Sequence, residues 1–428
     1  MFSAVHCIVV WRPHRVIRKQ LAILLVLGGI SCAQIGSSVG LQQEAGPATG
    51  RAGYAGDASC AACHRKQSDT YQHTPHHLTS QLPTPSTVHG SFHSGDNTVT
   101  IADPAQAAAP RLQFVMESRK DGMFETARTG WGADVFARSE RMDVITGSGM
   151  RGQTYLSWQG DRLFELPISY WSDGHRWINS PGYIDGTAEF SRPVNPACLE
   201  CHATYIRALS SDPGTNRYDR ESLMVGIACE SCHGPGANHV RREMQHLGNL
   251  KDAPHDDILN PAKFSRERKV DLCAECHNGI QREALKATFS YVPGRPLSEF
   301  FKQLPGSDSS HPDVHGNQVG LLEKSKCYQA SEQMSCTICH DVHTTGRSTA
   351  DYSLKCQGCH TWQSCGMSGK MGHTIANKCI ECHMPIEETD VIVSQTAGKV
   401  VHAKMRNHWI KVYPDVRLRE TAGATGRP

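Results

Sequence analysis

Apolar and aromatic residues are scarce in this chain of 428 residues. Only 39% of the chain is hydrophobic and 7% is aromatic, whereas glycine and proline number 38 and 22. A chain long enough for two or three domains normally has more apolar surface to bury. The composition therefore predicts that something besides ordinary side-chain packing stabilises the fold.

An excess of one charge is also absent. Lys and Arg together number 44, against 42 for Asp and Glu. No basic block of the kind that follows a phosphate backbone occurs along the chain. We therefore expect no nucleic-acid partner.

Long apolar runs are absent except near the N-terminus, where LAILLVLGGI (21–30) follows four basic residues and precedes small residues. This pattern is typical of a secretory signal, and the run is about half of the roughly 20 residues that span a bilayer. We expect a signal peptide over residues 1–33, cleaved near Ala33, and no membrane span in the mature chain. The alternatives are an uncleaved anchor, or a lipoprotein that begins at Cys32, although Gly29 replaces the usual aliphatic residue.

Cysteine, in contrast, is abundant and regularly placed. The chain has 18 cysteines, and most of them fall in seven CxxCH motifs. In chain order, the motifs consist of Cys60, Cys63 and His64; Cys198, Cys201 and His202; Cys229, Cys232 and His233; Cys273, Cys276 and His277; Cys336, Cys339 and His340; Cys356, Cys359 and His360; and Cys379, Cys382 and His383.

The spacing within each motif predicts covalent haem. Positions i, i+3 and i+4 share one face of a helical turn, so two thiols and one imidazole project toward the same flat partner. Haem c needs this set, with two thioether bonds and one nitrogen ligand to the iron. Zinc ribbons have similar cysteine spacing, but neither zinc nor a disulfide framework explains a histidine after every pair. We therefore expect seven covalently bound haem c groups.

Seven haems also account for the thin apolar composition, because each porphyrin adds apolar surface and two cross-links. The predicted fold consists of short α-helices and coil wrapped around packed haems, with a β-rich insert after the first motif. We place a first haem segment at 57–96, the insert at 97–190, a six-haem domain at 191–414 and a frayed tail at 415–428.

The insert is predicted from runs that alternate with turn residues, such as RLQFVMES, GQTYLSW and DRLFELPISYW. We expect four to six strands that carry most of the tryptophans. A packing role over one or two haems is favoured over a role in docking a partner, because aromatic strands are usually buried.

Histidines outside the motifs are numerous enough to give every iron a second imidazole. The Gly-Pro-Gly break after His233 predicts that His239 leaves its own haem for a neighbouring one. His343 lies on nearly the same side of a turn as His340 and is expected to reach an adjacent haem. Further distal ligands are predicted at His315, His373 and His408. The seventh distal site stays open between His93, His175 and His402.

The segments CESCHGPGANH, CTICHDVH and CIECHMP resemble those of multihaem c-type cytochromes, in the class of the tetrahaem cytochrome of ammonia oxidisers, ammonifying nitrite reductase and hydroxylamine oxidoreductase. The resemblance covers roughly residues 57–414, and the β-rich insert is similar to that of uncharacterised seven-CxxCH cytochromes. Among His73, His76 and His77, the family pattern implies His76 as a distal ligand. The absence of a CxxCK motif weighs against a nitrite reductase, and the presence of seven motifs instead of eight weighs against a hydroxylamine oxidoreductase.

Two cysteines of the exported chain, Cys327 and Cys365, belong to no motif. An oxidising compartment favours a disulfide between them. The alternative is that Cys327 supplies a thiolate to an iron.

The sequence thus predicts an exported periplasmic or cell-surface cytochrome that transfers electrons between redox proteins of the envelope. A haem with two imidazole ligands exchanges only electrons, whereas an iron with an open position can bind a substrate. The alternatives are a reductase or oxidase of a small nitrogen or sulfur compound at one open haem, and a subunit of a haem filament.

Overall fold

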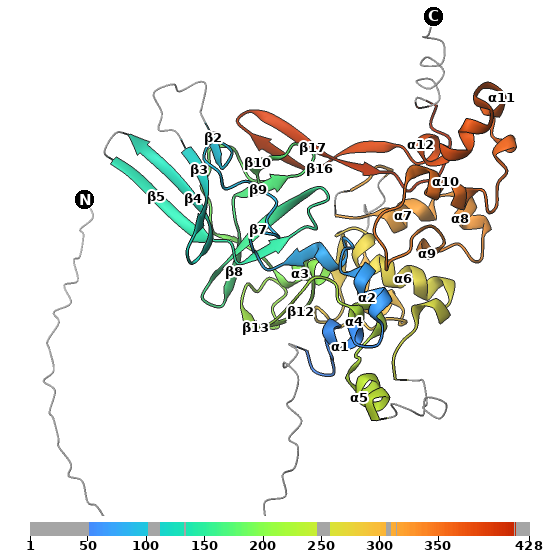
Figure 1. Cartoon of the computed structure of the whole chain (residues 1–428), viewed down its shortest axis with the longest axis horizontal. Helices are drawn as coiled ribbons and strands as arrows, with labels where there is room; N and C mark the ends of the chain where they lie inside the picture. Colours follow the sequence, from blue (N-terminus) through green and yellow to red (C-terminus); the bar gives the residue numbers. More distant parts are fainter. Residues whose placement is uncertain are drawn as a thin grey trace, which may run out of the picture. The chain divides into compact units, whose positions relative to one another are not determined.

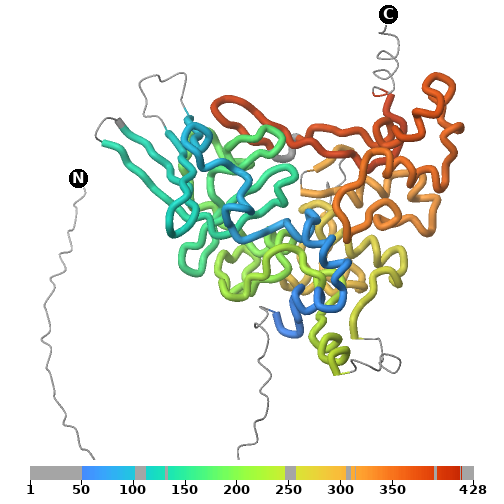
Figure 2. Tube along the Cα trace, viewed as in Figure 1, coloured from blue at the N-terminus to red at the C-terminus, as the bar shows by residue number. Residues whose placement is uncertain are grey.

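The computed structural model describes residues 51–101, 112–131, 134–245, 257–304, 310–313, 315–414 and 416. These residues belong to one compact unit, Ala48–Pro428, whose course Figure 2 traces along the sequence. The predicted signal peptide, Cys32 and nearly all of the predicted tail lie outside the described residues.

Four antiparallel strands that follow the first motif form one sheet (Figure 1). Their order is β2 (Thr98–Ile101), β3 (Leu112–Arg119), β4 (Gly122–Trp131) and β5 (Asp134–Arg141). Along β3, Leu112, Phe114 and Met116 are buried and the residues between them are not. Because side chains alternate between the two faces of a strand, one face of the sheet points toward a core.

The neighbouring sheet has seven strands. Its main path runs through β1 (Ser80–Gln81), β6 (Val144–Thr146), β7 (Gly152–Gln159), β8 (Arg162–Glu165) and β11 (Arg192–Pro193), and β7 also pairs with β9 (Ile168–Trp171), which pairs with β10 (Arg176–Asn179). The largest apolar cluster joins the two sheets, since Phe114 and Met116 pack with Tyr155, Ile168 and Trp177. Trp177 is only 4% exposed, which favours the packing role over the docking role for this aromatic residue.

The described part of the predicted insert has more strands than the expected four to six, because β2 to β10 all fall within it. The run DRLFELPISYW forms two strands, β8 and β9, since Pro167 between them has no N–H to donate to a ladder. Strand β5 was missed because nearly all of its side chains are exposed, so its sequence shows no alternation.

The motif-bearing part of the chain consists of short helices, of which the longest has 12 residues. Their bounds are α1 (Asp57–Ala61), α2 (Arg65–Tyr71), α3 (Pro196–His202), α4 (Cys229–His233), α5 (Ala237–Gln245), α6 (Arg266–His277), α7 (Gln318–Glu323), α8 (Lys326–Ala330), α9 (Cys336–Cys339), α10 (Thr349–Cys356), α11 (Ser368–Met371) and α12 (Cys379–His383). Short 3₁₀ turns add η1 (His77–Thr79), η3 (Pro261–Lys263), η4 (Leu297–Glu299), η5 (Trp362–Ser364) and η6 (Gly372–Asn377). No helix in the described ranges is long and apolar enough to cross a bilayer.

Three hairpins correct the expectation of only helix and coil in the six-haem region. They pair β12 (Ala203–Ala208) with β13 (Tyr218–Val225), β14 (Arg282–Ala284) with β15 (Phe301–Gln303), and β16 (Ile386–Thr396) with β17 (Lys399–Arg406). Each antiparallel pair satisfies its own backbone groups, so it needs no long apolar run in the sequence.

The β16–β17 hairpin is fixed to the β-rich sheets near its turn. The Asn179 side chain, 3% exposed, donates hydrogen bonds to the Gln395 carbonyl (2.6 Å) and to Asp185 (2.9 Å). The Asn179 backbone N–H donates to Thr396 Oγ1 at 2.8 Å. Polar side chains therefore hold a C-terminal hairpin against strand β10.

Candidate haem-binding sites

Four motifs lie in helices that end at the motif histidine. Helices α3, α4, α6 and α12 place their Cys-x-x-Cys-His sequences in the last turn, as the spacing predicts. Helix α3 begins at a capping asparagine, because the Asn195 side chain accepts a hydrogen bond from the Cys198 N–H.

The other three motifs extend past the end of a helix but keep the same turn. In each, the histidine N–H donates to the carbonyl of the first cysteine, over 2.8 Å from His64, 2.9 Å from His340 and 2.9 Å from His360. This bond is the α-helical i to i−4 contact. All seven motifs therefore place their thiols and imidazole on one side of a helical turn.

Four motif histidines lie opposite a histidine from elsewhere in the chain. The ring centres are separated by 6.5 Å for His64 and His239, 6.2 Å for His233 and His343, 6.0 Å for His277 and His76, and 6.2 Å for His340 and His408. All four non-motif partners are among the predicted distal ligands.

This separation fits one iron between each pair. Two imidazoles on opposite sides of an iron, with metal–nitrogen bonds of about 2 Å, have ring centres about 6 Å apart. The iron–nitrogen bonds lie in the ring planes, so rotation about their axis leaves the spacing unchanged. The observed interplanar angles, from 19° to 86°, are all compatible with such a pair.

Several of the predicted iron-binding histidines have Nδ1 engaged, which leaves Nε2 for a metal. Backbone carbonyls lie near Nδ1 of His233 (Leu259, 2.8 Å), His383 (Lys411, 2.9 Å) and His408 (Arg406, 3.1 Å), and side-chain oxygens lie near Nδ1 of His202 (Thr79, 3.2 Å), His277 (Gln318, 3.1 Å) and His315 (Asp313, 2.8 Å). Nδ1 of His239 lies 3.3 Å from the Arg242 guanidinium, a donor, and 3.6 Å from Asp257 Oδ1. Most of these orienting partners are distant in sequence from their histidines, so no local pattern predicts them.

Burial keeps several of these imidazoles neutral. It lowers the pKa of His408 to about 4 and also lowers the pKa of His202, His233 and His277. A neutral imidazole is the form that binds a metal, so the environment suits the predicted role.

Two predicted distal ligands, His315 and His373, are not among the four histidine pairs. His315 lies close enough to His202 to lower its pKa, after the larger effect of burial. The His373 ring packs against Trp362 at 5.2 Å and has no motif histidine among its ring contacts in the described residues. The three candidates for the seventh distal site lie in different places. His93 and His175 line a groove that contains no motif residue, whereas His402 lies in β17.

The seven motifs are connected through neighbouring cysteines. Pairs of motif cysteines lie near enough for one to lower the pKa of the other: Cys229 and Cys60 in the third and first motifs, Cys276 and Cys201 in the fourth and second, and Cys273 and Cys336 in the fourth and fifth. Besides Cys336 and burial, nearby Cys232 raises the pKa of Cys273, and besides burial, nearby Cys379 and Cys339 raise the pKa of Cys356. No motif is therefore isolated from the others.

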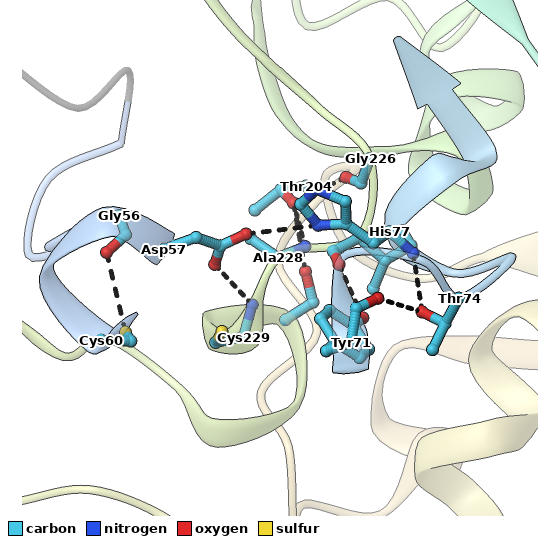
Figure 3. A network of polar contacts seen from close by, with 12 residues as sticks. Gly56, Asp57, Cys60, Tyr71, Thr74, His77, Thr204, Gly226, Ala228 and Cys229 are labelled. Atoms are coloured by element: carbon cyan, nitrogen blue, oxygen red, sulfur yellow. Dashed lines mark hydrogen bonds and ion pairs between the residues drawn. The ribbon is translucent and has the colours of Figure 1, made fainter. Parts of the chain in front are cut away.

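Asp57 joins the first and third motifs (Figure 3). Its Oδ1 accepts a hydrogen bond from the Cys229 N–H at 2.9 Å, and its Oδ2 lies 3.5 Å from His77 Nδ1. Helix α4 has no cap from its own N-terminal residue, so Asp57 of helix α1 satisfies that end. The contact also gives His77 a structural role that is distinct from the predicted role of His76.

Glu230 makes a second connection between the same motifs. It is 1% exposed, and its carboxylate accepts backbone N–H groups of Ala55 (2.8 Å), Gly56 (2.9 Å) and Gly236 (2.7 Å). Three donors satisfy a charge that burial would otherwise make costly.

The predicted disulfide between Cys327 and Cys365 is absent, and both residues are free cysteines. Cys327 lies in α8, where its neighbours include Cys339 and Cys356 of the fifth and sixth motifs. Cys365 follows η5. The disulfide expected from an oxidising compartment is therefore wrong, because the fold places Cys327 beside motif cysteines.

Comparison with known proteins confirms the resemblance to multihaem c-type cytochromes. Residues 174–234 match the family described as cytochrome c554 and c-prime. The C-type polyheme cytochrome OmcB of Geobacter sulfurreducens is 29% identical over 162 residues, which is 34% of this chain and 19% of OmcB. The multiheme cytochrome MtrA of Shewanella baltica is 22% identical over 197 residues, 44% of this chain and 45% of MtrA.

The fold is similar to that of a solved cytochrome. The outer cell wall cytochrome OcwA superposes with a TM-score of 0.52 and 14% identity, over 86% of this chain and 82% of OcwA. The aligned part spans only about a fifth of OmcB and less than half of MtrA. The comparisons thus establish the kind of fold and the kinship with haem proteins.

Proposed function

We propose that this chain is an exported electron-transfer protein that carries seven covalently bound haem c groups. The cysteines of each motif would form the two thioether bonds, and the motif histidine would be the proximal ligand. Haem supplies one-electron exchange at its iron. The motif histidines and the distal histidines would bind the irons through imidazole and hold the groups at fixed positions.

The paired histidines support this role most directly for four sites. His239, His343, His76 and His408 would be the distal ligands opposite His64, His233, His277 and His340. His315 would complete the second site, and His373 is proposed for the sixth. An iron with two imidazoles has no vacant position for a substrate, so such sites exchange only electrons.

The main support for electron transfer is that the seven motifs form a continuous series of neighbours. The helices of linked motifs also contact one another, as α1 does with α4, α3 with α6, α6 with α9, and α10 with both α9 and α12 (Figure 1). Electrons move rapidly only between haems that lie close together. A connected series therefore fits conduction through the protein between redox partners of the cell envelope.

A reductive titration tests this function. Under anaerobic conditions, dithionite is added in small steps while the haem absorbance is followed. We expect seven one-electron equivalents per chain and rapid reoxidation when a small acceptor is added. Uptake of clearly fewer electrons, or reduced haems that no added acceptor reoxidises, would contradict the proposal.

A second candidate function is a reductase or oxidase at one open haem, and the sixth motif favours it most. Cys359 and His360 are both exposed, and His360 has no histidine among its ring contacts in the described residues. If His373 does not bind this iron, the sixth haem would have a free position for a small nitrogen or sulfur compound.

A further inference from the structure

A groove on the β-rich side of the protein contains no CxxCH residue. It has a volume of about 730 Å³ and lies between the segment that leads into β2, the turn before β10, and the turn of the β16–β17 hairpin. Seven of its lining residues are charged or titratable, namely His89, His93, Asp96, Tyr170, His175, Arg176 and Lys399. We call it the Arg176 groove.

Positive charge in the Arg176 groove is not neutralised. Neither Arg176 nor Lys399 has a carboxylate within ion-pair distance among the described residues, and Asp96 is the one carboxylate that lines the groove. The Arg176 guanidinium lies over the Trp171 ring at 5.2 Å, a contact that orients it and leaves its N–H donors available. Two permanent cations in a concave site attract anions.

The walls of the groove are held in place by close packing. A Cβ atom on Gly90 would lie 2.0 Å from the Trp177 ring, and one on Gly149 would lie 2.1 Å from the His89 ring. Only glycine allows these two rings to approach the backbone so closely. The hydrogen bonds of Asn179 fix the hairpin that carries Lys399. The groove is therefore a preformed site.

His175 adds a sign of specific use. It has a positive φ of 48°, a conformation that costs energy for a residue with a side chain and that is often found at functional sites. With His89 and His93, it adds imidazole N–H donors to the guanidinium and ammonium groups. His93 and His175 are also candidates for the seventh distal site, but the groove that they line contains no motif residue.

We propose that the Arg176 groove binds a small anion with at least two negative charges, borne on carboxylate or phosphate groups. Its volume lies within the range of roughly 300–1,000 Å³ that is usual for small-molecule sites and is larger than a single ion requires. The two cations give the charge complement, and the histidines and hydroxyls of Ser91 and Thr396 give hydrogen bonds. This inference is independent of the electron-transfer proposal.

Calorimetric titration of the haem-loaded protein with citrate and with pyrophosphate tests the proposal. We expect saturable 1:1 binding of at least one probe, and the tighter probe identifies carboxylate or phosphate as the preferred group. The double variant Arg176→Gln/Lys399→Gln should weaken binding at least tenfold. Because both residues are exposed, the haem absorption spectrum should not change.

Lys302→Gln is the matched control, since this lysine is exposed and lies on the separate β14–β15 hairpin. It should bind the anion as the unmodified protein does. Absence of binding for both probes, or unchanged binding in the double variant, would overturn the proposal. Weakening in Lys302→Gln as large as in the double variant would also overturn it, because net charge alone would then account for the effect.

Discussion

In several histidines of this protein, the two ring nitrogens have different roles. Nδ1 often contacts a carbonyl or side-chain oxygen, as in His233 and His315, and Nε2 is thereby left for an iron. This arrangement fixes both the tautomer and the ring orientation. The motif spacing alone predicts which histidines are proximal, and a local feature, the Gly-Pro-Gly break, singled out His239.

Replacing His239 with alanine tests the ligand assignment at the first motif. We expect seven covalent haems to remain, because the thioether cysteines are unchanged. One iron should change from low spin to high spin in the electron paramagnetic resonance spectrum, since it loses an imidazole. His73→Ala is the control, as His73 is exposed and follows the same motif. An unchanged low-spin count in His239→Ala would show that His239 binds no iron.

Glu165 should make the stability of the protein depend on pH. Burial raises the pKa of Glu165 to about 7, from an ordinary value of 4.5, despite the opposing effect of Arg192. The folded state therefore holds a proton that the unfolded state releases between these two pH values. The stabilisation from this group is complete below pH 4.5 and is lost as pH rises through 7.

Glu165→Gln should remove that loss, which is on the order of 3 kcal/mol. Thermal unfolding followed by circular dichroism from pH 4.5 to 8 measures it, and the variant should show the flatter profile. Glu189→Gln, at an exposed position, should keep the slope of the unmodified protein. Parallel profiles for Glu165→Gln and the unmodified protein would contradict the assignment.

At the scale of elements, the sequence predicted the motif turns better than the strands. A CxxCH turn depends on local spacing, so all seven could be located. Strands in the apolar core, such as β3, show alternation and were also predicted. Strand β5 and the β16–β17 hairpin were not, because β5 and β17 bury none of their side chains and so show no apolar alternation. The histidine pairs likewise depend on tertiary contacts.

Asn179→Ala should loosen the β16–β17 hairpin from strand β10. The change removes the side-chain donor to Gln395 and Asp185, and the loss of these two hydrogen bonds costs about 1–3 kcal/mol. Hydrogen–deuterium exchange should become faster in residues 393–399, with little change in the motif helices. Thr100→Ala, at an exposed position in β2, is the control. Unchanged exchange at the hairpin in Asn179→Ala would show that these bonds do not hold it.

At the scale of the whole molecule, two kinds of core coexist. The β-rich sheets pack ordinary apolar side chains around Phe114 and Tyr155. A second apolar cluster extends from these sheets to Leu199 of helix α3, whereas the cluster at helices α6 and α7 is small and centres on Val270, Ala274 and Val319. Haem groups would supply the missing apolar surface there, which explains how a chain with 39% hydrophobic residues can fold.

Intact-mass measurement of the exported protein tests the number of haems. We expect the mass of the mature chain plus seven haem groups, because each CxxCH motif keeps its cysteines and histidine in one turn. Replacing both Cys356 and Cys359 with alanine should reduce the count by one. A count below seven in the unmodified protein would show that at least one motif has another role.

We propose that the irons exchange electrons and bind no substrate, which requires a second imidazole at the second, sixth and seventh motifs as well as at the four paired sites. Titration of the fully reduced protein with carbon monoxide tests this claim most directly, because carbon monoxide binds ferrous haem only at a vacant position. We predict no change in the haem absorption bands. Binding at one haem in seven, seen as a partial shift of the Soret band, would contradict the electron-transfer proposal and favour an enzyme with one open site.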